Sequence, residues 1–358
     1  MHRAGSPAIT VKATIVLATL AGVAALLPVP AAWIESAYSS TTYRWIQPLL
    51  TRSSNATPFA WFDAAILSAC VGWVWMVVRD ARRVGAGGAA LRATLRTVSW
   101  AATAYLAFLA LWGLNYRRRP LTDTLAFDRA AITTGSARRV ARISIDRLNT
   151  LAADAHRTGW APAGTIDPAL RDGLLRATRD LGLPMPAVAR PKRTLLDPYF
   201  RRAGVEGMTD PYFLETLIVG DLLPFERPFV VAHEWSHLAG LADESAASFA
   251  GWLACVHGSP SDQYSGWLFL YEELTAALPA SDQNAAGAAL GPVPRADLAA
   301  SRARIRANVQ PRVSAAAWRA YDSYLKSNHV AAGTRSYDEV VQLVLGTRFD
   351  DSWTPARR

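Results

Sequence analysis

Long apolar runs dominate the first third of the chain, with polar segments between them. Three runs each approach the roughly 20 residues that a helix needs to cross the hydrocarbon of a bilayer: about Ala13–Ile34, Phe59–Val78 and Thr97–Leu114. Trp112 closes the third run and Tyr116 follows it, and aromatic side chains of this kind suit a membrane interface. The pattern predicts a three-helix transmembrane anchor over residues 1–116, embedded in a lipid bilayer.

A cleaved signal peptide is the alternative for the first run. Its basic start at Arg3 and Lys12, its apolar centre and the small residues Ala31 and Ala32 are typical of such peptides. However, the apolar character continues to Trp33, and two further runs follow, which favours a membrane helix. In either case the chain is held in the membrane.

Arginines between the runs predict the orientation. The segment between the second and third runs carries five of them, Arg79, Arg82, Arg83, Arg92 and Arg96. The segment between the first two runs carries only Arg44 and Arg52. Because basic segments stay in the cytoplasm, we expect residues after Tyr116 on the outer side of the cytoplasmic membrane. The Arg117–Arg119 run opposes this orientation without reversing it.

From Arg117 onward the pattern becomes that of a water-exposed domain. Helical periodicity covers residues 125–158 and 166–182, and we expect further helices at 228–239, 244–257, 314–327 and 337–346. Residues 203–223 mix β-branched and aromatic residues with Gly and Pro, which predicts a strand or hairpin. The fold class expected is therefore a membrane protein whose residues 117–358 form a mainly helical α+β domain.

Composition agrees with this division. The chain is 51% hydrophobic and 19% charged, and the apolar excess lies in the first 115 residues. The net charge of +9 would suit a nucleic-acid-binding protein, but the arginine clusters flank apolar runs, where they set membrane orientation. We therefore expect no nucleic-acid partner. The two cysteines, Cys70 and Cys255, do not form a zinc-binding pair by spacing.

The segment PFVVAHEWSHLAG carries the candidate chemistry. His233 and His237 are four residues apart, so on a helix both imidazoles face the same side and can bind one zinc ion. Glu234 lies beside the first ligand, where it can take the proton of a metal-bound water as general base. The alternative is an ordinary amphipathic helix with two surface histidines.

The third zinc ligand is predicted to be Glu244. In an unbroken helix Glu244 would lie about 10 Å beyond His237 along the axis, too far to share a metal. The helix must therefore end, and Gly240 suits a left-handed turn at that point. Asp243 then becomes the N-cap of a second helix, on which Ser248 could support a ligand. The alternative assigns Asp243 as the ligand.

Fragments along most of the chain resemble a bacterial membrane family known as domain of unknown function 3810. They are ESAYSSTTYRWIQPLLT, PFAWFD, WGLNYRRRPL, GMTDPYFLE, LLPFERPFVVAHEWSHLAGLADESAASF and YDSYLKSNHVAAGTRSYDEVV. The resemblance implies a zincin-like metallopeptidase domain on three membrane helices, with no established substrate.

The same resemblance bears on single residues. After the HExxH motif the family's pattern reads approximately as a glycine and then E-x-E-A-N-F. Gly240, Glu244, Ala247 and Phe249 match this pattern, whereas Ala246 and Ser248 depart from it. The match favours Glu244 as a ligand. A second family pattern, P-F-x-x-E, is matched at Pro211, Tyr212 and Glu215 without an assigned role.

Together these features predict a membrane-anchored zinc metallopeptidase that hydrolyses a peptide or protein substrate at the outer face of the cytoplasmic membrane. Tyr337, in the tail fragment, is a candidate donor to the developing oxyanion, with a packed core tyrosine as the alternative. Two other functions stay open: an intramembrane protease, and a non-catalytic membrane protein with a structural zinc site. Structural sites are usually closed by four protein ligands, which favours catalysis here.

Overall fold

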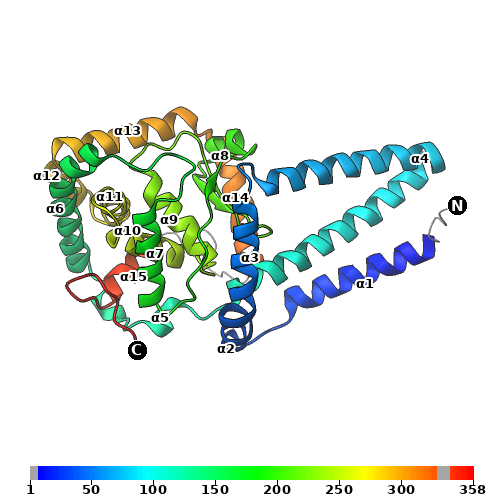
Figure 1. The fold of residues 1–358 in the computed structure, drawn as a ribbon, viewed down its shortest axis with the longest axis horizontal. Coiled ribbons are helices and arrows are strands. Elements are labelled where there is room, and N and C mark those ends of the chain that lie inside the picture. Colours follow the sequence, from blue (N-terminus) through cyan, green and yellow to red (C-terminus); the bar gives the residue numbers. More distant parts are fainter. Residues whose placement is uncertain (1–6, 329–338) are drawn as a thin grey trace.

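The computed structural model describes residues 7–328 and 339–358, which form an elongated arm and a rounded body (Figure 1). The arm consists of α1 (Pro7–Leu26) and α4 (Trp61–Leu111). α4 folds back on itself at Gly85, whose φ of 74° and ψ of 175° are not helical. Its two halves are joined by a hydrogen bond of 3.0 Å from Trp73 Nε1 to Thr97 Oγ1.

The prediction of three separate transmembrane helices is wrong. Among the described residues, one helix, α4, is long and apolar enough to cross a membrane. The pair Val11–Leu26 and Ala31–Asn55, bent by 104°, makes a second candidate only if it is counted as one span. The second and third apolar runs both belong to α4, because the arginine-rich segment between them is itself helical. The first run is broken after Leu26, next to Pro28 and Pro30.

The segment between α1 and α4 lies across the base of the arm, against the body. It contains α2 (Ala31–Trp33), the π-helix η1 (Ile34–Thr42) and α3 (Tyr43–Asn55). From α3, Gln47 Nε2 donates to the carbonyl of Ala187 at 2.7 Å, and Thr51 Oγ1 donates to that of Leu214 at 2.9 Å. The division of the chain at residue 116 stays a prediction, and α3 is bonded to segments from beyond that point.

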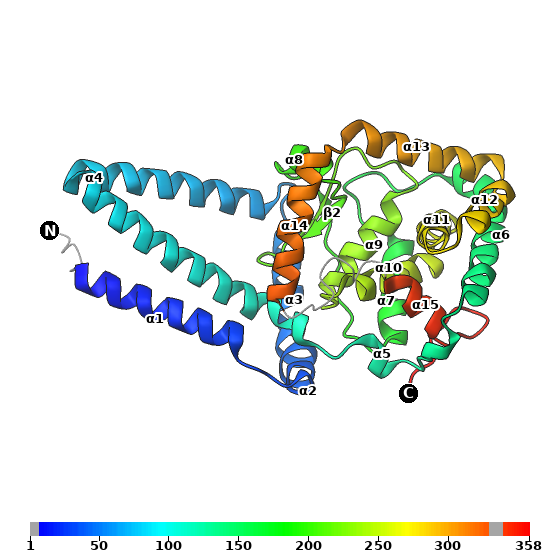
Figure 2. The ribbon, with the colours of Figure 1, turned by 180° about the vertical axis from the view of Figure 1, so that it is seen from behind.

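The body is mostly helical. Its short helices are η2 (Gly113–Arg117), α5 (Leu121–Thr124), η3 (Arg129–Ala131), α8 (Asp197–Ala203) and α15 (Val340–Gly346). Its longer helices are α6 (Thr134–Thr158), α7 (Pro168–Asp180), α9 (Arg227–Leu238), α10 (Glu244–Val256), α11 (Pro260–Ala276), α12 (Ala280–Ala289), α13 (Pro292–Asn308) and α14 (Pro311–Ser327). Seen from behind, α14 lies where the arm meets the body (Figure 2). The core forms around α9, α10 and α11, where Trp235, Trp252 and Trp267 are buried.

A small sheet lies beside α9. Its strands are β1 (Pro191–Lys192), β2 (Gly207–Thr209) and β3 (Thr216–Ile218), in the order β1-β3-β2. β1 runs parallel to β3, whereas β2 is antiparallel to it, with Met208 opposite Leu217. The hairpin predicted over 203–223 is therefore confirmed, and β2 is an edge strand.

The predicted helices around the HExxH motif are also confirmed, since α9 and α10 match 228–239 and 244–257 closely. The helix expected from residue 125 begins only at Thr134, because Thr133 and Ser136 form a capping box there. Among the longer helices of the body, α11 to α13 were not predicted. For α11 a signal existed: Ser259, Pro260 and Asp262 form a capped helix start.

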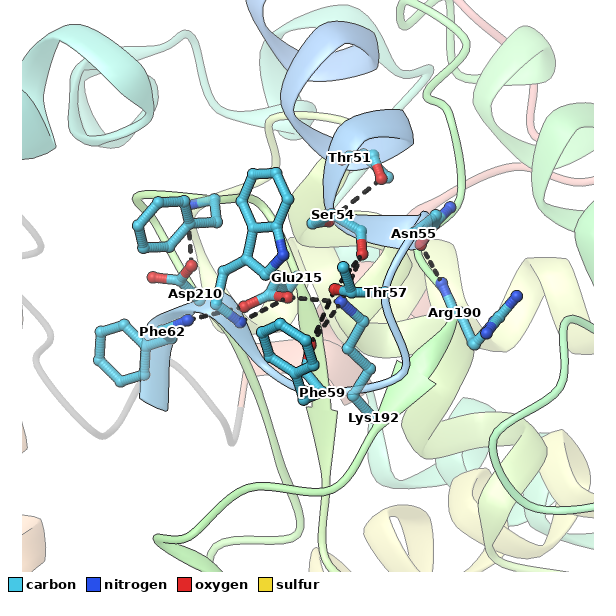
Figure 3. A network of polar contacts seen from close by, with 12 residues as sticks. Thr51, Ser54, Asn55, Thr57, Phe59, Phe62, Arg190, Lys192, Asp210 and Glu215 are labelled. Atoms are coloured by element: carbon cyan, nitrogen blue, oxygen red, sulfur yellow. Dashed lines mark hydrogen bonds and ion pairs between the residues drawn. The ribbon is translucent and has the colours of Figure 1, made fainter. Parts of the chain in front are cut away.

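A buried ion pair fixes the beginning of α4 to the sheet (Figure 3). Lys192 Nζ lies 2.6 Å from Glu215 Oε1, and their side chains are 1% and 0% exposed. The Glu215 carboxylate also accepts the backbone N–H groups of Trp61 at 3.1 Å and Phe62 at 3.0 Å. These N–H groups belong to the first turn of α4, where an anion is favoured. Glu215, which the sequence left without a role, therefore holds the arm in place.

Candidate metal centre

The candidate site is built by α9, a tight turn and α10. α9 ends at Leu238, and Gly240 follows with a φ of 82°, a left-handed conformation that favours glycine. Asp243 caps α10, since its side chain accepts the backbone N–H of Ala246 at 2.9 Å. The predicted break at Gly240 and the predicted cap at Asp243 are both confirmed. The turn brings Glu244 back towards the two histidines.

Three side-chain atoms of the site form a small triangle. His233 Nε2 and His237 Nε2 lie 3.2 Å apart, and Glu244 Oε2 lies 3.2 Å from the first and 3.5 Å from the second. Tetrahedral ligands at about 2.0–2.1 Å from a zinc ion lie roughly 3.3–3.4 Å from one another. The three residues are therefore spaced as three ligands of one metal ion.

The donor chemistry fits a cation as well. Glu244 Oε2 is buried and accepts no hydrogen bond within the part of the chain that the structure describes. A buried carboxylate oxygen without a donor is costly unless a cation or a donor lies next to it. Two imidazole nitrogens and one carboxylate oxygen also form a ligand set that zinc commonly takes.

Further contacts orient each of the three residues. His237 Nδ1 donates to the carbonyl of Leu241 at 2.6 Å, which leaves Nε2 of the neutral ring free to bind a metal. His233 Nδ1 lies 3.1 Å from Ser248 Oγ, so Ser248 is in contact with the candidate ligand that it was predicted to support. The Tyr321 hydroxyl of α14 donates to Glu244 Oε1.

Charges within the triangle stabilise one another. Burial lowers the pKa of His237, but the neighbouring Glu244 carboxylate outweighs burial and raises this pKa to about 9. Burial acts in the opposite sense on Glu244, yet the two histidines hold its pKa well below its ordinary value. Both groups therefore carry charge at neutral pH without a metal, and a bound zinc ion would take the place of the His237 proton.

Glu234 stands apart from the triangle and faces β2. Thr209 Oγ1 donates to Glu234 Oε2 at 2.9 Å and to the Glu234 carbonyl at 2.8 Å. A Cβ atom at Gly207 would lie only 2.7 Å from Glu234 Oε1, so glycine leaves the room that this carboxylate occupies. Burial raises the pKa of Glu234. A buried carboxylate with a raised pKa beside a candidate metal site is suited to proton transfer.

All four residues line one cavity of about 780 Å³. The edge strand β2 lines it through Gly207, Met208 and Thr209. Aromatic side chains from the base of the arm and from α14 line it too: Phe62, Trp112, Tyr116, Tyr321 and Tyr324. Its volume lies in the upper half of the usual range for ligand sites, about 300–1,000 Å³, and it gives room to several residues of an extended peptide.

The structure thus brings together His233, Glu234, His237 and Glu244, as predicted. Tyr337 lies outside the described residues, so its predicted role is not addressed. Sequence reasoning missed Tyr321, although the family-like tail fragment contains it. It also missed Trp112 as a neighbour of His237, because a link between residues so far apart in sequence leaves no local pattern.

The comparisons with known proteins give one finding. The model of the family described as "Protein of unknown function (DUF3810)" matches residues 38–345, which is most of the chain. No curated protein and no solved structure matches it.

Proposed function

This chain belongs to the DUF3810 family of unknown function, and we propose that it is a membrane-anchored zinc metallopeptidase. The observation that carries the proposal is the triangle of His233, His237 and Glu244, whose ligand atoms lie 3.2–3.5 Å apart. Beside this triangle lies a further carboxylate, Glu234, which is held by β2. A structural zinc site has no use for such a group, whereas hydrolysis needs a base at this position.

Zinc bound by the triangle would lower the pKa of a water molecule and polarise the scissile carbonyl. The chain's own residues do the rest. Glu234 takes a proton from the attacking water as the oxygen bonds to the carbonyl carbon. It then gives a proton to the leaving amine as the C–N bond breaks. Thr209, which donates to Glu234, keeps the carboxylate in position.

The edge strand β2 supports binding of an extended peptide. Within the described residues it is paired on one side only, with β3, and three of its residues line the cavity. An extended substrate can add to such an edge through backbone hydrogen bonds. Because Thr209 of β2 bonds to Glu234, a peptide on this edge would pass directly beside the base.

The arm supports a place in the membrane. Leu20, Val23, Leu67, Val71 and Trp75 are each more than half exposed along α1 and α4. The apolar stretch of α4 is not buried within the molecule, so lipid is the surrounding that suits it. We place the protein in the bacterial cytoplasmic membrane with the body on the outer side. The site lies in the body and not in the arm, and its ionisable side chains would be costly in hydrocarbon. This favours a water-accessible site over cleavage inside the membrane.

Glu234→Gln in the full-length protein tests the proposal. We expect about one zinc per chain in both the wild type and the variant, because Glu234 is a base and not a ligand. We expect the wild type to cleave members of a mixed peptide library and the variant to lose this activity by at least about a thousandfold. Zinc is measured by mass spectrometry of the metal, and products by mass spectrometry of the peptides.

Asp172→Asn is the matched control, because it also turns a carboxyl group into an amide but lies on the exposed surface of α7. Its activity should equal that of the wild type. A zinc-loaded wild type that cleaves no peptide, whether free in solution or joined to a membrane helix, would instead indicate a structural zinc site.

A further inference from the structure

The turn that sets up the metal triangle is bonded to the base of the arm. Trp112 follows α4 directly, and its Nε1 donates to the carbonyl of His237 at 3.1 Å. The Trp112 and His237 rings lie 6.1 Å apart, centre to centre. Tyr43 also donates to the carbonyl of Leu238, at 3.1 Å. A single residue, Trp112, therefore connects the end of the apolar arm to the candidate ligand His237.

The cavity reaches the same point. Phe62 lies in the first turn of α4, and Trp112 and Tyr116 lie just past its end. Tyr212 stacks on Phe62, with ring centres 6.4 Å apart and planes 11° from parallel. We call these four residues the aromatic wall. Because α4 folds back on itself, both of its ends lie at the base of the arm (Figure 1). Phe62 and Tyr212 line the cavity at the beginning of α4, and Trp112 and Tyr116 line it just past the end.

This position has a consequence if the arm lies in lipid. Aromatic side chains at the ends of membrane helices lie at the level of the lipid head groups. The partly exposed Phe62, Tyr116 and Tyr212 would then lie at the membrane surface, and Trp112, which is buried, contacts His237 of the metal triangle. An extended chain advances about 3.3–3.6 Å per residue. The Trp112 and His237 rings are 6.1 Å apart, about two residues of extended chain, so a segment that passes the aromatic wall would reach the triangle within a few residues.

We infer that the substrate is a membrane protein, cleaved in the segment that directly adjoins one of its transmembrane helices. The inference rests on the proposed peptidase function. The aromatic wall receives the segment as it leaves the lipid, and β2 binds it in extended form beside Glu234. A peptide free in solution does not meet the aromatic wall as it leaves the lipid. A cleavage site far from the membrane does not meet it either.

The test uses the full-length zinc protein in vesicles of phosphatidylcholine and phosphatidylglycerol, with three synthetic substrates. The first is a leucine-rich membrane helix followed directly by a short randomised segment. The second carries a spacer of about 20 Gly and Ser residues between the two, which spans roughly 25 Å. The third is the randomised segment alone. The first two substrates have the same surface concentration, so a difference between them reports the position of the segment.

We expect cuts in the first substrate within about five residues of the helix end, and at least about tenfold less product from each of the other two. Equal product from the first two substrates would overturn the inference and leave the peptidase function standing.

Crosslinking gives a readout that does not depend on cleavage. The Glu234→Gln protein carries benzoylphenylalanine in place of Tyr212, or in place of Trp45 as the control. Trp45 is exposed on α3 and does not line the cavity. We expect crosslinks from position 212, and not from position 45, to the segment of the first substrate. The inference fails if position 212 crosslinks the first two substrates equally. Crosslinking at 212 without cleavage of any substrate by the wild type would support the docking and overturn the peptidase.

Discussion

Asp243 and Glu244 are neighbours with the same kind of charged group, yet their backbone positions give them different partners. The Asp243 side chain accepts the N–H of Ala246 and the hydroxyl of Ser245, the latter at 2.6 Å. Glu244 begins α10 and turns its Oε2 towards both histidines. The Asp243 carboxylate is thus engaged by the start of α10, whereas Oε2 of Glu244 is left to bind a cation.

We therefore expect Glu244→Ala and Asp243→Ala to act differently. Glu244→Ala should lower zinc affinity by more than about a hundredfold, because even residues that only support a ligand contribute about 10–100-fold. Asp243→Ala should keep the zinc and lower the free energy of unfolding by about 1 kcal/mol, the usual effect of losing an N-cap. Competition with a chelator measures the affinity. Loss of zinc from the aspartate variant alone would make Asp243 the ligand.

Tyr321 gives a second prediction at this scale. Its hydroxyl donates to Glu244 Oε1, while its ring stacks on Tyr324, with centres 5.8 Å apart. Tyr321→Phe keeps the ring and removes the donor, so we expect zinc affinity to fall by about 10–100-fold with the fold unchanged. Tyr199→Phe, on a half-exposed residue of α8, is the control and should bind zinc like the wild type. Unchanged affinity in both variants would show that Tyr321 does not support the ligand.

The residues of the site differ in how well the sequence predicts them. His233, Glu234 and His237 follow from spacing on one helix, and Glu244 follows from a helix break at Gly240, so all four depend on local geometry. Tyr321 approaches from a helix that begins 67 residues after Glu244, at Pro311. Such a contact is made by tertiary packing, and hydrophobic periodicity contains no information about it.

At the scale of elements, α6, α7 and α14 each have an apolar stripe and were predicted, whereas α11 was not. α11 is buried on nearly all sides, so it lacks the alternation of apolar and polar faces on which a periodicity argument depends. α4 was divided wrongly for a related reason. Its apolar runs are separated by arginines, and windows of hydropathy cannot tell a loop from a charged stretch of continuing helix.

The ion pair under α4 gives a prediction for this scale. Glu215→Gln leaves Lys192 buried and charged without its carboxylate, which should lower the free energy of unfolding by about 3–5 kcal/mol. Adding Lys192→Met removes the unpaired charge and should restore much of that loss. Asp172→Asn breaks the exposed pair with Arg171 and should cost less than about 1 kcal/mol. Thermal unfolding of the full-length protein in detergent measures all of these variants. A Glu215→Gln protein as stable as the Asp172→Asn control would show that the pair does not hold the arm.

At the scale of the whole molecule, the arm and the body form one hydrogen-bonded unit. Glu215 binds the beginning of α4. Trp112, which follows the end of α4, donates to the last turn of α9. Arg118 donates to the turn that follows α9. Arg118 Nη1 donates to the carbonyls of Ala239 at 3.2 Å and Gly240 at 3.1 Å. The position of the metal triangle relative to the membrane is therefore set by the fold. Whichever side of the membrane holds the base of the arm also holds the proposed active site.

The charges at the two ends of the arm decide that side. The bend of α4 carries five arginines, Arg79, Arg82, Arg83, Arg92 and Arg96. Asp80 pairs with Arg96 at 2.7 Å and offsets only one of these charges. The Arg117–Arg119 run at the base, which opposed the predicted orientation, is partly engaged. Arg117 donates to the carbonyl of Ala24 at the end of α1, at 2.8 Å, and Arg118 pairs with Glu35 at 2.6 Å.

Since basic segments stay inside, we expect the bend in the cytoplasm and the base outside. A reporter fused after residue 90 should then be active only in its cytoplasmic form, and one fused after residue 130 only in its exported form. If both fusions report the cytoplasm, the base arginines dominate after all, and the substrate must be sought on the cytoplasmic side.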